Sequence, residues 1–208
     1  QPKARIERET SRAGWHQSAR EHFHRYSITL AGSVHLNSSH GFFSQPEYLH
    51  VLVNPVLTHV LPFAALALLL ALIGRSPGGT KIALVLVFLS AAAVWPTVHF
   101  GHGGFDRVRS MADATGGDWL LIHRHRAEKG AVIFYATAVL ALGALFASLK
   151  WQKGFVRLSW VTLLVSLLAC AAAVRIAAPA GKIRHREFRH ADPPATELQA
   201  AKTEAGED

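Results

Sequence analysis

The stretch VLVNPVLTHVLPFAALALLLALIG, residues 51–74, decides the fold class, because its only ionisable side chain is that of His59. A helix of about 20 apolar residues is long enough to cross the hydrocarbon core of a bilayer. An imidazole within such a segment is energetically costly and by default indicates a functional site. The position of His59 therefore directs attention to the other histidines of the chain.

Three more apolar blocks of similar length follow the first, at about 82–100, 130–149 and 156–178. Half of the 208 residues are hydrophobic and only 17% are charged. A helix of a soluble bundle carries a polar face, and stretches such as LVLVFLSAAAV (84–94) have none. We therefore predict an all-α, integral membrane four-helix bundle with lipid as its surroundings.

The chain divides into three parts by composition. Residues 1–50 form a polar, histidine-rich arm in which 15–27 can make an interfacial helix. Residues 51–190 form the four-transmembrane-helix domain. Residues 191–208 are a polar, acidic tail, which we expect to be extended.

Prolines and glycines predict where the helices begin, bend and end. We expect the first span to start at Asn54-Pro55, with the asparagine as cap and the proline in the first turn. Pro96 is expected to kink the second span, and the glycine-rich segment 101–119 to form a loop. Trp95 and Trp119 are expected in the interfacial aromatic belts.

The charge and the single cysteine exclude several functions. No basic patch with interleaved aromatic residues accompanies the net charge of +8, so nucleic acid is not expected as a partner. Cys170 lies inside the fourth apolar block and is expected to be a small buried residue. No CxxCH motif exists, so any haem must be bound non-covalently.

The thirteen histidines all fall on one predicted membrane face. With four spans, the arm, the 2–3 connection and the C-terminus share that face, and the short basic turns 75–81 and 150–157 on the other face contain no histidine. The spans on the histidine face contribute His59, His99, His102, His123, His125, His185 and His190. The arm contributes His16, His22, His24, His35, His40 and His50, which we interpret as surface or partner-contact residues.

Imidazole is a good ligand for haem iron, zinc or copper, and bundles build such sites between facing helices. Alanine- and glycine-rich stretches in spans 2, 3 and 4 allow a flat porphyrin to fit. We predict His59 and His125 as the first ligand pair of a bis-histidine haem b, with His185 and His99 as further cofactor-binding candidates. His102 and His123 are additional metal-ligand candidates. The alternative is that these histidines are interfacial or capping residues.

Acidic residues are absent from the four blocks, which argues against a carboxylate proton relay. No HExxH, GxSxG or phosphate-loop motif is present, so a stand-alone catalyst is not indicated. The carboxylates nearest the histidines are solvated or orient an imidazole: they are Asp106, Asp113, Asp118 and Glu128.

The motif NPVLTHVLP (54–62) resembles the start of a bacterial membrane family known as domain of unknown function 2231. That family begins its first span with His-Pro, followed by a second histidine and a proline; Pro55, His59 and Pro62 fit, whereas Asn54 replaces the first histidine. His125 (or His123) is similar to the family's histidine at the start of span 3, and AGKIRH (180–185) is similar to its Gly-Gly-x-apolar-x-His ending.

The resemblance implies a place in the bacterial inner (cytoplasmic) membrane, beside c-type cytochromes and with the histidine face in the periplasm. It thus implies electron transport in a respiratory chain. The basic residues contradict this orientation, because they are more numerous on the histidine face than in the two opposite turns.

Three functions remain open. The first is a cytochrome b subunit that transfers electrons between the quinone pool and a periplasmic redox partner, with haem iron and a quinone as cofactors. The second is a non-catalytic structural or assembly subunit of a larger respiratory or photosynthetic membrane complex. The third is a metal-handling protein whose ligands are His22, His24, His35 and His40.

Overall fold

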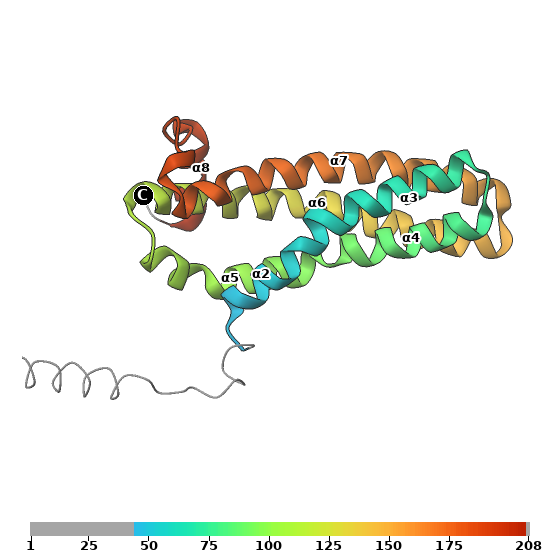
Figure 1. The fold of residues 1–208 in the computed structure, drawn as a ribbon, viewed down its shortest axis with the longest axis horizontal. Helices are drawn as coiled ribbons and strands as arrows, with labels where there is room; N and C mark the ends of the chain where they lie inside the picture. The colour runs from blue at the N-terminus through green and yellow to red at the C-terminus, as the bar shows by residue number, and fades with distance from the viewer. Residues whose placement is uncertain (1–43, 207–208) are drawn as a thin grey trace, which may run out of the picture. The chain divides into compact units, whose positions relative to one another are not determined.

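The computed structural model describes residues 44–206, which are drawn in colour in Figure 1. The expected interfacial helix at 15–27 lies outside the described residues. So do the arm histidines, His50 excepted: they are His16, His22, His24, His35 and His40.

Four long helical segments make up most of residues 44–206, and this part of the chain contains no strand. All four are long and apolar enough to cross a membrane, which confirms the predicted all-α four-helix membrane architecture. The first two are interrupted and the last two continuous: α2 (Pro46–Pro55), the π-helical turn η1 (Val56–Val60) and α3 (Leu61–Ile73); α4 (Pro77–Ala92) and α5 (Val94–Ser110); α6 (Ala114–Lys150); α7 (Gln152–Arg184).

Prolines account for both interruptions. Pro55 ends α2 and Pro62 opens α3, so that the backbone between them takes the wider π-helical form. Pro96 lies in the first turn of α5, directly after the break at Ala93. Since proline has no N–H to donate, the helix ladder is disrupted there. This break lies three residues before Pro96, at which we predicted a kink.

The helices extend beyond the predicted spans at the histidine end. The first helix begins at Pro46, in the favoured N1 position, so the predicted start at Asn54 is wrong. The predicted loop 101–119 is also largely helical, because α5 continues to Ser110 and α6 begins at Ala114. Asp113 caps α6 by accepting a 2.7 Å hydrogen bond from the Gly116 N–H.

The bundle interior combines leucines such as Leu61 and Leu68 with many small side chains, whereas large apolar side chains are common on its outer surface. Ala65, Ala141 and Ser166 are each at most 1% exposed, whereas Phe63 and Val139 are about 70% exposed. Small residues allow helices to approach closely inside a membrane, while large apolar residues face lipid. The four buried hydroxyls of the α6–α7 core bond to the carbonyl of the preceding turn of their own helix: Thr137, Ser159, Thr162 and Ser166.

A second apolar cluster lies at the polar end of the bundle. Trp119 is 4% exposed there and packs with Phe105 and Ile183, so its predicted place in an interfacial belt is wrong. Trp95 is 63% exposed, as expected for a belt residue. The C-terminal tail, expected to be extended, instead forms the helix α8 (Ala195–Ala205), and Ala201 of α8 is buried in this cluster.

Figure 1 shows the α3–α4 and α6–α7 turns at one end of the bundle, and the α5–α6 turn and α8 at the other. A 37-residue helix such as α6 is about 55 Å long, whereas the hydrocarbon core is about 30 Å thick. The histidine end of α6 therefore extends well beyond the apolar layer, together with α8.

Candidate functional site

Eight histidines lie within residues 44–206, and all of them belong to the half of the bundle that ends in the α5–α6 turn and α8. They are His50, His59, His99, His102, His123, His125, His185 and His190. The structure sorts them into an imidazole pair between helices, a group paired with carboxylates, and a group with exposed side chains.

The imidazole pair consists of His50 on α2 and His123 on α6. Their ring centroids lie 6.5 Å apart, and the ring planes are nearly perpendicular at 89°. Both side chains are half-buried. Among the described histidines, this is the pair of rings that the structure brings together from two different spans.

Each imidazole of the pair is oriented by a backbone carbonyl of a third or fourth helix. His50 Nδ1 lies 2.8 Å from the Thr97 carbonyl oxygen on α5, and His123 Nδ1 lies 2.8 Å from the Ile176 carbonyl oxygen on α7. A carbonyl only accepts, so Nδ1 carries the proton in both rings. In a neutral imidazole that donates from Nδ1, the lone pair of Nε2 is available to a ligand, an arrangement typical of metal-binding histidines.

Glycines allow α2 to pack closely enough on α5 for this geometry. A Cβ at Gly101 would stand 3.0 Å from His50 Nδ1, and a Cβ at Gly104 would stand 2.8 Å from the Glu47 Cα. The sequence GHGG at 101–104 thus provides a smooth surface on α5. We predicted a loop from these glycines, and in the structure they instead allow α2 and α5 to pack closely.

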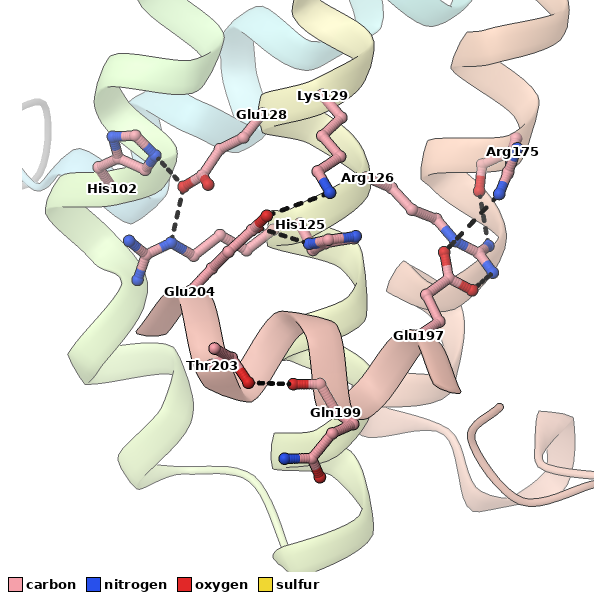
Figure 2. Close-up of polar contacts among 11 residues, drawn as sticks. His102, His125, Arg126, Glu128, Lys129, Arg175, Glu197, Gln199, Thr203 and Glu204 are labelled. Atoms are coloured by element: carbon pink, nitrogen blue, oxygen red, sulfur yellow. Dashed lines mark hydrogen bonds and ion pairs between the residues drawn. The ribbon is translucent and has the colours of Figure 1, made fainter. Parts of the chain in front are cut away.

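The second group pairs histidines with carboxylates at the α6–α8 contact, shown in Figure 2. His125 is 9% exposed, and its Nδ1 lies 2.7 Å from Glu204 Oε2. Lys129 Nζ contacts the other oxygen of Glu204 at 3.1 Å. The ammonium of Lys129 and the imidazole of His125 together hold the pKa of Glu204 below its ordinary value.

A neighbouring ion-pair group joins α6, α7 and α8 (Figure 2). Arg126 donates two 2.7 Å hydrogen bonds to the two oxygens of Glu197. The third nitrogen of Arg126 donates to the Arg175 carbonyl oxygen at 3.0 Å. This carbonyl has no helical partner in α7, because the residue four positions later is Pro179, which has no N–H. The guanidinium of Arg126 lowers the pKa of Glu197.

On the far side of α6, Glu128 accepts from His102 Nε2 at 2.7 Å and from Arg124 Nε at 2.8 Å. This contact realises the predicted alternative in which a carboxylate orients an imidazole. Asp113 instead binds the two arginines that follow α7, Arg186 and Arg189, both at 2.9 Å. Arg189 is the main cause of the low pKa of Asp113, about 2.

The remaining predicted ligands have exposed side chains. His59 lies in the π-helical turn, with its Nδ1 2.8 Å from Thr58 Oγ1. His99 stacks on Trp95 at 5.6 Å between ring centroids, and His185 contacts Glu187 at 2.9 Å. The predicted first pair thus has separate contacts: His59 with its neighbour, and His125 with Glu204.

Sequence reasoning missed His50, because it placed the helix start at Asn54 and left His50 in the arm. The signal was present in Pro46, a residue suited to the first turn of a helix. A helix from Pro46 places His50 one turn before Asn54, within the span. Sequence reasoning also missed the partners Glu197 and Glu204, which it assigned to an extended tail.

Comparison with known proteins adds no relationship. No known protein-family model, no curated protein and no solved structure matches the chain. The resemblance to the domain of unknown function 2231 therefore stays a prediction.

Proposed function

We propose that the chain is a b-type cytochrome subunit of a membrane electron-transfer system, in which His50 and His123 would hold the iron of one haem. The observation that carries the proposal is the 6.5 Å separation of the two imidazole centroids. Two imidazole nitrogens at about 2.0 Å from one metal, each roughly 1.2 Å from its ring centre, would place the centroids about 6.4 Å apart.

The donor set fits haem better than a bare metal ion. Within residues 44–206, no group of three or more His, Cys, Asp or Glu side chains is arranged to hold a metal ion. A porphyrin supplies four nitrogens to its iron, so two imidazoles complete the coordination. When bound, the haem would supply one-electron exchange.

The chain's own residues would fix the ligands and set their basicity. The Thr97 and Ile176 carbonyls accept the Nδ1 protons of His50 and His123 and fix the orientation of the two rings. The pair lies in the half of the bundle that ends in the α5–α6 turn and α8. We propose that electrons pass there to a partner outside the membrane. The quinone pool and a periplasmic c-type cytochrome are the proposed donor and acceptor.

A pyridine-haemochrome assay of the purified protein tests the proposal. We expect about one haem b per chain in the wild type and loss of the haem in His50→Ala and His123→Ala. His99→Ala and His185→Ala are matched controls with exposed rings, and they should keep the haem. Purified protein without a haemochrome band would exclude this function, and loss of haem in His59→Ala and His125→Ala instead would move the ligand set to those two residues.

A further inference from the structure

A cavity of about 290 Å³ lies between α6, α7 and α8. It neighbours the imidazole pair, because Ile176 lines the cavity and its carbonyl oxygen contacts His123. Three of its lining residues are cations, namely Arg126, Lys129 and Arg175. Its apolar lining consists of Gly130, Ala172 and Ile176. A volume of this size is at the lower end of the range for small-ligand sites.

Two of the three cations keep donors that a ligand can use. Arg126 is committed, because its guanidinium binds both Glu197 oxygens and a backbone carbonyl. Arg175 is 74% exposed along its side chain and reaches Glu197 only at 3.8 Å. Lys129 is 61% exposed and makes one contact with Glu204.

The cavity lies where the polar end of the bundle meets its apolar surface. Three residues beyond Lys129 on α6, Val132 is 69% exposed, and directly before Arg175 on α7, Val174 is 71% exposed. Cations at a boundary with an apolar surface match an amphiphile with an anionic head. Basic pockets between transmembrane helices recognise lipid headgroups in this way.

We propose that this cavity binds the phosphate of an anionic phospholipid, with Lys129 and Arg175 as its ligands and the acyl chains along α6 and α7. Glu197 competes with the phosphate, because it approaches the same guanidinium groups from α8. The acidic helix therefore limits occupancy of the site: a lipid phosphate gains affinity when the carboxylate is neutralised.

Native mass spectrometry of the purified full-length protein tests the site, because it measures the lipid that the protein retains. The protein is first exchanged into nanodiscs of either phosphatidylglycerol or phosphatidylcholine and then returned to detergent. The wild type should retain phosphatidylglycerol selectively. The double variant Lys129→Gln/Arg175→Gln should bind phosphatidylglycerol with about 30-fold lower affinity than the wild type. This factor corresponds to roughly 1 kcal/mol for each basic residue. Lys150→Gln/Lys153→Gln removes two exposed cations from the opposite turn and should leave retention unchanged.

Glu197→Gln should have the opposite effect on lipid binding, a gain rather than a loss. Phosphatidylglycerol retention should rise several-fold, because Arg175 and Arg126 then lack their carboxylate. A fall or no change in this variant would overturn the competition. Equal retention of the two lipids by the wild type would overturn the site, and displacement of the lipid by millimolar inorganic phosphate would show that the cavity binds free phosphate instead.

Discussion

Glu197→Gln should make α8 open more often from the bundle, without detaching it for most of the time and without unfolding the bundle. The helix has 11 residues, and its buried contact is small, with only Ala201 fully covered. An isolated helix of this length is marginal in water. Its attachment therefore relies on polar contacts to α6. They are the contacts of Glu204 with His125 and Lys129, and the two 2.7 Å hydrogen bonds between Arg126 and Glu197, whose side chains are only 16% and 19% exposed.

Neutralising this carboxylate should reduce the free energy of α8 opening by about 2 kcal/mol, within the range for hydrogen bonds to charged groups. Hydrogen exchange measures this loss directly. Because each 1.4 kcal/mol corresponds to a factor of ten, the protection factors of the α8 amides should fall about 30-fold. Glu187→Gln is the control, because Glu187 is 64% exposed in its contact with His185. Unchanged α8 protection in Glu197→Gln would refute attachment by this ion pair, and an equal loss across α6 and α7 would show a global effect.

Three further predictions concern packing and pH. Gly104→Ala should destabilise the bundle by about 1–3 kcal/mol in a thermal or denaturant melt, since its Cβ would stand 2.8 Å from a Cα of α2; Gly143→Ala, which meets nothing within 4 Å, should be neutral or slightly stabilising. Ala141→Leu should cost a similar 1–3 kcal/mol in the same melt, because Ala141 is fully buried, and an unchanged midpoint would contradict the close helix packing. The depressed pKa of Asp113 means that its carboxylate contributes its full stabilisation of the folded state above the ordinary aspartate pKa of 3.8, and that this contribution is lost as the pH falls toward about 2; protection of the Gly116 amide, which donates to Asp113, should fall in that window, whereas protection lost already near pH 6 would contradict this assignment.

The number and order of the four long helices were predictable from the sequence, because a helix that faces lipid has a long run of apolar residues. The exposed positions of α3, α4, α6 and α7 are large and apolar, so four blocks without carboxylates stand out. The helix ends were not predictable from hydropathy. The helix α6 begins 16 residues before the predicted block at 130, since the backbone continues helical through polar residues such as Arg124 and Glu128 once they pair with each other.

The side-chain pairs of the site could not be predicted, because they join residues far apart in sequence. His125 and Glu204 are 79 residues apart, and Arg126 and Glu197 are 71 apart. These contacts depend on α8 folding back onto α6, which the composition of the tail did not indicate. The concentration of histidines at one end was visible from the sequence, whereas the pairing of His50 with His123 required the true start of the first helix.

Low-temperature electron paramagnetic resonance of the oxidised, purified protein tests the central claim most directly, because it reports the axial ligands of a haem iron. With His50 and His123 as ligands, the ring planes cross at 89°. The account predicts a highly anisotropic low-spin signal, as expected for perpendicular imidazoles, and its loss together with the haem in His123→Ala. A low-spin signal that persists unchanged in both His50→Ala and His123→Ala, or no haem signal in the wild type, would contradict it.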